Sequence, residues 1–465
     1  MKALNPVWLS GAEVLPIIEG GKGISVTNGE SSGAWAASGG VGTFSGVNAD
    51  SYDADGNPIP QVYHGKTRFE RHLELIEYSV RGAITQARIA HDMAGGKGRL
   101  HMNILWEMGA AETILNRALE GARGLIHGVT CGAGMPYKLA EACARFRVFY
   151  YPIVSSSRAF RALWKRAYHR YAEWLGAVVY EDPWRAGGHN GLSNSENPEE
   201  PQDPYPRVRE LRSLMNEMGL ESTPIIMAGG VWFLREWEDW IDNPELGPIA
   251  FQFGTRPLLT KESPISDAWK DRLLHLESGD VWLNRFSPTG FYSSAVRNGF
   301  LQELADRSQR QIAFAPEAVG ELDTPLPISA GRRTVFVAPA DKLRAEDWMR
   351  AGFTEALRTP DSTLIFVTPE KAGEIRTDQI DCMGCLSACQ FSNWAQNEGH
   401  TTGRKADPRS YCIQKTLQVI SHSDDIEDQL MFAGHNVFRF AQDPFYSNGF
   451  IPSVKQLVDR IRSGD

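Results

Sequence analysis

Residues 185–191, RAGGHNG, place a histidine and three glycines directly after GAVVY (176–180), an apolar run with the character of a buried strand. Histidine titrates near neutral pH, so His189 can take or give a proton at a substrate. Glycine lets the backbone come close to a ligand. We therefore predict that His189 is a catalytic residue aimed at a bound cofactor. The alternative is a histidine that only hydrogen-bonds a loop carbonyl.

Two other strand ends are rich in glycine, MAGGVW at 227–232 and FGTRPL at 253–258. Backbone N–H groups at such ends, and at the helix starts that follow them, can bind a phosphate. The pattern predicts a phosphate site at Gly229, Gly230, Gly254 and Thr255. Glycines that only form tight turns are the alternative.

A cysteine-rich stretch, DCMGCLSAC, supplies Cys382, Cys385 and Cys389, and Cys412 follows after 22 further residues. Thiolates grouped in this way bind soft metal centres. Zinc usually takes two C-x2-C pairs, so one close triple with a distant fourth cysteine favours a [4Fe–4S] cluster, with zinc or no metal as the alternatives. Cys131 and Cys143 are expected to be buried thiols.

The elements that must position these residues alternate between apolar runs and helical stretches. Helical periodicity marks 73–93 and 159–175. The expected strands are 14–18, 39–45, 99–105, 124–130, 147–153, 176–181, 223–228 and 248–254. Eight strand–helix units predict an α/β fold of the (β/α)8 barrel type, whose chemistry gathers at the C-terminal strand ends. A doubly wound open sheet is the alternative.

The chain leaves this pattern beyond the barrel. A Pro-rich linker is expected at 323–332, then strand, helix and strand within 332–370, and an amphipathic closing helix at 452–465. The predicted organisation is a barrel over 1–310, an inserted small α/β and cysteine-rich segment over 311–412, and a C-terminal helical segment over 413–465 that packs back on the barrel. The acidic loop 195–207 is a solvated connection or a lid.

Composition limits the class of protein. The net charge of −9 argues against a nucleic-acid partner. We expect no membrane segment, because the sequence has no apolar run of about 18 residues. Six cysteines without an apparent export signal favour a cytoplasmic protein.

A group of motifs resembles the nitronate monooxygenase family, which is similar to the FMN-dependent enoyl-ACP reductases: PIIEGGKGIS, AASGGVGTFSG, HMNIL, AGGHNG, IIMAGGVW, FQFGTRPLLTKES, NRFSPTGFYSSAVRN and QLMFAGHNVF. The resemblance covers 8–310 and 413–462. It implies an FMN-binding barrel with the phosphate at Gly229, Gly230, Gly254 and Thr255. It also implies that Asn103, Gly20, Gly21, Gly187 and Gly188 lie beside the cofactor, and that His189 is the catalytic histidine.

One departure concerns the substrate. Where many members have Pro-Met after the first strand, this chain has Gly21 and Lys22. Lys22 either contacts the flavin or points to solvent, and His435 is a second candidate for the substrate pocket.

The function that we predict is FMN-dependent oxidation of alkyl nitronates, or of a similar small carbon acid, with His189 as base. The alternative is an NAD(P)H-dependent reductase of enoyl or other activated alkenes, with the iron–sulfur cluster as a relay. A third hypothesis is a flavin-binding subunit whose inserted segment docks an electron-carrier protein. A homo-oligomer is compatible with each of them.

Overall fold

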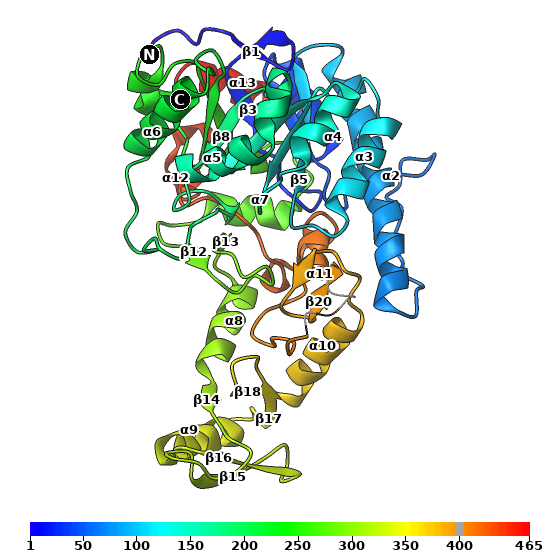
Figure 1. Cartoon of the computed structure of the whole chain (residues 1–465), viewed down its shortest axis with the longest axis vertical. Helices are drawn as coiled ribbons and strands as arrows, with labels where there is room; N and C mark the ends of the chain where they lie inside the picture. The colour runs from blue at the N-terminus through cyan, green and yellow to red at the C-terminus, as the bar shows by residue number, and fades with distance from the viewer. Residues whose placement is uncertain (397–400, 402) are drawn as a thin grey trace.

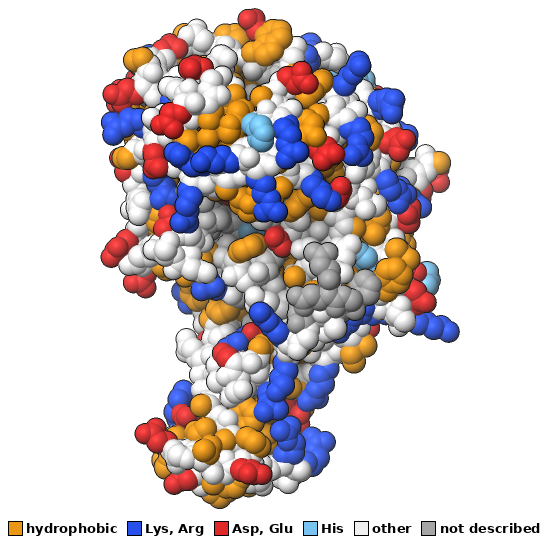
Figure 2. Space-filling model, viewed as in Figure 1, with side chains coloured by type: hydrophobic (Ala, Val, Ile, Leu, Met, Phe, Trp, Pro, Cys, Tyr) orange, Lys and Arg blue, Asp and Glu red, His pale blue; other side chains and the backbone are white. Residues whose placement is uncertain are grey.

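The computed structural model describes residues 1–396, 401 and 403–465, with the barrel as the wider body and an inserted lobe projecting from it (Figures 1 and 2). Eight parallel strands close into a barrel in the order β10-β11-β3-β4-β5-β6-β7-β8. They are β3 (Ile17–Glu19), β4 (Val41–Ser45), β5 (Arg99–Leu105), β6 (Gly128–Gly132), β7 (Phe149–Val154), β8 (Val178–Glu181), β10 (Ile225–Ala228) and β11 (Ile249–Phe253). The (β/α)8 prediction is confirmed, and the open-sheet alternative is wrong because β10 pairs with β8 and β11 pairs with β3.

These strands are buried on both faces because the barrel interior packs against one face and the helices against the other. The helices around the barrel are α1 (Gly29–Ala37), α2 (Arg68–Ala94), α3 (Ala111–Gly121), α4 (Leu139–Phe146), α5 (Ser157–Arg166), α6 (Pro204–Glu217) and α7 (Asp267–Leu274), with the 3-10 helices η1 (Tyr168–Trp174), η2 (Leu234–Trp240) and η3 (Arg256–Leu258). The predicted helix 159–175 is therefore two elements, because Ala167 leaves the helical backbone region with φ −143°.

The inserted lobe lies below the barrel and is connected to it by α8 (Gly299–Gln309) and α10 (Pro369–Ile380) (Figure 1). It contains α9 (Pro339–Arg350), the sheet β14-β18-β17 and the hairpin β15–β16. The strands are β14 (Gln311–Ala313), β15 (Thr324–Ile328), β16 (Arg333–Val337), β17 (Glu355–Arg358) and β18 (Thr363–Val367). Its buried residues form a hydrophobic cluster separate from that of the barrel.

The Pro-rich linker that we expected at 323–332 is wrong, because half of that stretch is the strand β15. Pro325 and Pro327 alternate with the buried Leu326 and Ile328, so the prolines occupy the exposed face of an edge strand, where a missing N–H is tolerated. The expected strand, helix and strand over 332–370 are β16, α9 and β18, with β17 as an additional strand.

The cysteine-bearing segment forms the short hairpin β19 (Ala388–Cys389) and β20 (Trp394–Ala395). The chain then returns to the barrel through α11 (Ile413–Gln418), η5 (Val419–Ser421), η6 (Ile426–Asp428), α12 (Arg439–Gln442), η7 (Pro444–Gly449) and α13 (Val454–Arg462). Helix α13 is the predicted closing helix, and it packs on α1. Within the part of the chain that the structure describes, none of the helices has both the length and the apolar character needed to cross a bilayer.

The N-terminal end of the barrel is filled by the hairpin β1 (Val7–Leu9) and β2 (Ala12–Val14). Its turn residue Ser10 places its Oγ 2.8 Å from His101 Nε2 and 2.7 Å from the Tyr151 hydroxyl. All three residues are buried, so this end of the barrel contributes stability.

This buried histidine makes stability depend on pH. Burial lowers the pKa of His101 to about 3, with nearby His127 and Arg99 acting in the same direction. An unfolded histidine titrates near 6.5, so the unfolded state binds more protons below that pH. The free energy of unfolding should therefore fall below pH 6.5, by up to about 1.4 kcal/mol per pH unit. In urea unfolding, His101→Gln should have a shallower decline from pH 7 to 5 than wild type, whereas His275→Gln, at an exposed site, should match wild type. An unchanged decline in His101→Gln would contradict this account.

Candidate active site

A cavity of about 1410 Å³, counting its open mouth, lies at the C-terminal ends of the barrel strands. His189 and Lys22 line it, as do all the residues predicted beside a cofactor: Gly20, Gly21, Asn103, Gly187, Gly188, Gly229, Gly230, Gly254 and Thr255.

The floor of the cavity is polar. Asn103 of β5, Glu181 of β8 and Gln252 of β11 face inward near the C-terminal ends of their strands, because side chains alternate along a strand, and all three line the cavity. Among the described residues, none forms a side-chain hydrogen bond with any of these three. Burial, helped by the charge of Asp182, raises the pKa of Glu181 to about 8, so its carboxyl group is protonated at neutral pH. Three unpaired polar groups in one layer are suited to a planar ring that carries both donors and acceptors.

The glycines after β10 and β11 serve different purposes. Gly229 and Gly230 have φ of 84° and 80°, which other residues rarely adopt. At Gly254, by contrast, an added Cβ would meet no atom within 4 Å, so this position faces open space. Among the described residues, none accepts a hydrogen bond from the backbone N–H groups of Gly230 or Thr255. Free N–H groups beside an open space are the features that an anionic group requires.

His189 lies on the two-residue strand β9 (Gly188–His189), which pairs with β13 (Ser293–Val296) of the hairpin that begins at β12 (Val281–Asn284). Its Nε2 is 2.6 Å from Ser287 Oγ, which in turn lies 2.8 Å from Thr289 Oγ1. Burial lowers the pKa of His189 to about 4. The imidazole is therefore neutral at physiological pH, with one ring nitrogen engaged by a hydroxyl.

The two glycines before His189 bring two distant chain segments together. A Cβ at Gly187 would lie 2.5 Å from the carbonyl carbon of Ala433, so only glycine permits this approach. The same C-terminal segment holds both glycine loops. Gly434 donates to Thr255 Oγ1 at 2.9 Å, and Asn436 Nδ2 donates to the Gly230 carbonyl at 2.6 Å.

Lys22 lies in the cavity wall. Its Nζ donates to the Gly20 carbonyl at 2.7 Å, and burial, partly offset by Glu19, lowers its pKa to about 8. The neighbouring Gly21 has no room for a side chain, because a Cβ there would be 2.3 Å from Asn103 Cβ. The residues that replace Pro-Met therefore place a cation in the cavity.

His435 lies just behind the wall. Its Nε2 is 3.1 Å from Ser294 Oγ and its backbone N–H donates to the Arg185 carbonyl. Its neighbours Gly434 and Asn436 line the cavity, whereas His435 does not.

The four clustered cysteines are free, and Cys385 is the one that lines the cavity. Within the described chain, no group of three or more His, Cys, Asp or Glu side chains is placed to hold a metal ion. Cys131 and Cys143 are buried thiols, as expected.

The outer wall of the cavity was not predicted. It is apolar and consists of Val47, Met108, Leu386, Ile413, Leu417 and Phe432. Ser287, which holds His189, was also missed, although it lies within the motif NRFSPTGF. Glu181 and Gln252 could have been found by counting every second residue along their strands.

A closed barrel with glycine-lined loops around a cavity at its C-terminal face defines a cofactor-dependent barrel enzyme. The family model for nitronate monooxygenase matches residues 86–387, and the chain belongs to that family. It is accordingly an FMN-dependent oxidoreductase.

The chain is similar to several solved structures at low sequence identity. The enoyl reductase domain of MlnA from the macrolactin biosynthesis cluster of Bacillus amyloliquefaciens is 12% identical, covers 97% of this chain and 93% of that chain, and has a TM-score of 0.54. FabK from Thermotoga maritima is 15% identical, covering 97% and 92%, with a TM-score of 0.48. Nitroalkane oxidase from Streptomyces ansochromogenes is 17% identical, covering 64% and 79%, with a TM-score of 0.44. No curated protein sequence matches the chain.

The environment of His189 predicts its titration. The ring nitrogens should show an apparent pKa near 4, well below the ordinary value of about 6.5. Nitrogen-15 NMR of ring-labelled protein checks this, with His189→Gln identifying the signal. A His189 signal that titrates at 6.5 or above would show that the ring is solvated or paired with an anion.

Proposed function

We propose that this FMN-dependent oxidoreductase reduces an activated alkene, an α,β-unsaturated carbonyl compound with an apolar chain, using NAD(P)H as the hydride source. The observation that carries the proposal is the apolar outer wall above a polar floor. Leu386, Ile413 and Leu417 come from segments outside the barrel and extend the wall beyond what a small nitronate needs. A hydrocarbon chain gains about 0.8 kcal/mol for each CH₂ that it buries. The MlnA domain, whose fold matches nearly the whole chain, is an enoyl reductase domain, which supports the same choice.

The residues present fit FMN. Gly230 and Thr255 have free N–H groups and Gly254 faces open space, so the two loops that carry Gly229, Gly230, Gly254 and Thr255 suit the phosphate. Asn103 and Gln252 fit the polar edge of the ring system, with Gly20, Gly21, Gly187 and Gly188 allowing close approach. When bound, FMN supplies hydride transfer between NAD(P)H and the alkene.

His189 suits the role of a hydrogen-bond donor to the substrate carbonyl. A neutral imidazole can polarise a carbonyl whose oxygen gains negative charge as hydride reaches the β-carbon. A base with a pKa near 4 is poorly matched to deprotonating a carbon acid at neutral pH, which weighs against His189 as the base. The α-carbon then needs one proton. Lys22 and Glu181, each with a pKa of about 8, both carry one at pH 7.

Oxidation of alkyl nitronates is the second candidate, and family membership favours it. A nitronate is already an anion, so it needs no base. His189 would donate a hydrogen bond to the nitronate oxygen, and Lys22 would balance its charge. An iron–sulfur cluster is no part of either minimal reaction.

Anaerobic assays separate the two candidates. With NADPH or NADH and a medium-chain 2-enoyl thioester, we expect one nicotinamide to be oxidised per alkene reduced without oxygen. His189→Gln should lower kcat by about 10²-fold, as expected for a lost donor to a developing oxyanion. Leu417→Ala should raise KM about 10-fold for the medium-chain substrate and leave a short-chain one nearly unchanged. Oxygen-dependent turnover of an alkyl nitronate, with neither nicotinamide oxidised, would select the second candidate instead.

Gly254 tests the FMN site directly. Because a Cβ there meets no protein atom within 4 Å, Gly254→Leu should change the stability of the apoprotein by no more than about 0.5 kcal/mol. The leucine would fill the phosphate space, so FMN affinity should fall more than about 10-fold. Flavin fluorescence titration measures the affinity. Gly373→Leu, at an exposed position in α10 with equally open surroundings, is the matched control. Wild-type affinity in Gly254→Leu would place the phosphate elsewhere.

A further inference from the structure

The cysteine motif has no role in the reaction proposed above, yet it borders the same cavity. We propose that Cys382, Cys385, Cys389 and Cys412 bind a [4Fe–4S] cluster. The site does not depend on which substrate the flavin serves.

The fold brings the fourth cysteine to the other three. Cys382, Cys385 and Cys389 follow α10, and Cys412 directly precedes α11. None forms a disulfide. Ser392, in the turn of the hairpin whose first strand ends at Cys389, donates its hydroxyl to Cys382 Sγ at 3.0 Å. Ile413 and Gln414, which directly follow Cys412, line the same cavity as Cys385.

Hydrogen-bond donors surround these sulfurs. The Gly384 N–H and the Ser392 hydroxyl donate to Cys382 Sγ at 3.4 and 3.0 Å. Backbone N–H groups face the other three sulfurs, those of Phe391 and Ser392 at Cys389, of Lys415 at Cys412 and of Gln414 at Cys385. Donors of this kind stabilise the thiolates of metal-bound cysteines.

The cysteine segment is fastened to the barrel on one side. Arg71 Nε donates to the Cys382 carbonyl at 3.1 Å, and the Gly109 N–H donates to the Cys385 carbonyl at 2.8 Å. His72 Nδ1 lies 3.0 Å from the Gly384 carbonyl. These contacts fix the backbone of the C-x2-C turn from outside.

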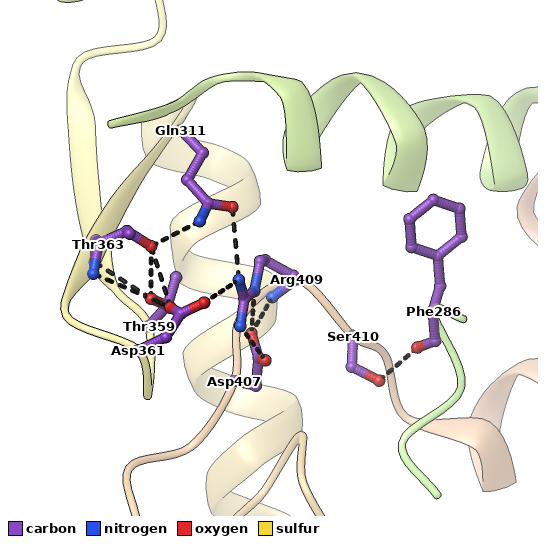
Figure 3. A network of polar contacts seen from close by, with 8 residues as sticks. All are labelled: Phe286, Gln311, Thr359, Asp361, Thr363, Asp407, Arg409 and Ser410. Atoms are coloured by element: carbon purple, nitrogen blue, oxygen red, sulfur yellow. Dashed lines mark hydrogen bonds and ion pairs between the residues drawn. The ribbon is translucent and has the colours of Figure 1, made fainter. Parts of the chain in front are cut away.

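The residues that precede Cys412 are held in place by a separate set of polar contacts (Figure 3). Arg409 pairs with Asp407 at 2.7 Å and with Asp361 of the inserted lobe at 2.8 Å. Ser410 Oγ donates to the Phe286 carbonyl at 2.7 Å, which ties the same turn to the loop after β12. These contacts fix the backbone on both sides and leave the thiol side chains able to rotate. Because the described side chains are not placed to hold a metal ion as they stand, binding the cluster requires the four thiols to rotate toward a common centre.

The spacing favours iron over zinc. A close triple with one distant cysteine is typical of [4Fe–4S] ligation, whereas tetrathiolate zinc sites usually use two C-x2-C pairs. Cys385 also lines the flavin cavity, which places the centre beside a redox cofactor.

The test uses the full chain, purified without oxygen and reconstituted with ferrous iron and sulfide. We expect about four irons and four sulfides per chain, with broad thiolate–iron absorption that dithionite bleaches. Cys412→Ser and Cys389→Ser should each lose more than half of the iron, whereas Cys143→Ala, at a buried thiol in α4, should retain it. FMN content and alkene reduction are measured on the same samples, so that failure of the proposed reaction is seen separately.

The wild-type protein decides the proposal even if a variant fails to fold. One zinc per chain in the purified protein, with no iron uptake, would overturn the cluster. So would a reconstituted chain that binds neither metal and whose four thiols all react with a thiol reagent under native conditions.

Discussion

The contact between the backbones of Gly187 and Ala433 is the constraint on which the site depends. It leaves no room for a side chain at residue 187. It joins the loop after β8 to a segment almost 250 residues later in the chain, and that segment then bonds to Thr255 and Gly230. The loops after β8, β10 and β11 are thus held together by one segment near the C-terminus. Phe432, the residue before Ala433, contacts the His189 ring with 5.5 Å between ring centres.

Burial around this contact sets the protonation of the site. The same low-dielectric cavity lowers the pKa of His189 and Lys22 and raises that of Glu181. All three changes disfavour charge, as desolvation does. Near pH 7 the cavity therefore offers a neutral imidazole and two groups that retain a proton. That combination is better matched to stabilising and protonating a carbanion-like centre than to creating one.

The sequence was sufficient to predict the barrel and much of its rim. Strands such as β10, with four buried residues in IIMA, are apolar on both faces, and glycines mark the ends where side chains are excluded. It was insufficient where contacts join distant segments. Nothing near Ile413 or Leu417 indicates that they cover a cavity formed by β3 and β8. The hydroxyl of Ser287 reaches His189 only because β13 pairs with β9. The sequence of β15 did have a pattern typical of a strand, because the apolar Leu326 and Ile328 alternate with exposed residues. The two exposed residues are prolines, which favour a linker over a strand, so the pattern was overlooked.

The inserted segment is better understood as part of the cavity than as an appendage. Cys385 and Leu386 lie in the wall, and Met108 of the barrel forms a β-bridge with Leu386. Arg409 couples the turn before α11 to the lobe through Asp361, and α11 contributes Ile413 and Leu417 to the same wall. Lys415 of α11 also pairs with Asp378 of α10 at 2.7 Å, so a change in the lobe can reach the apolar wall through two charged connections, without passing through the barrel strands. The barrel end of the cavity, with its glycines and polar floor, has no such connection to the lobe among the described contacts. The residues that we propose for FMN and those that we propose for the substrate thus lie in different parts of the chain, so a substitution in the second group can leave the first unchanged.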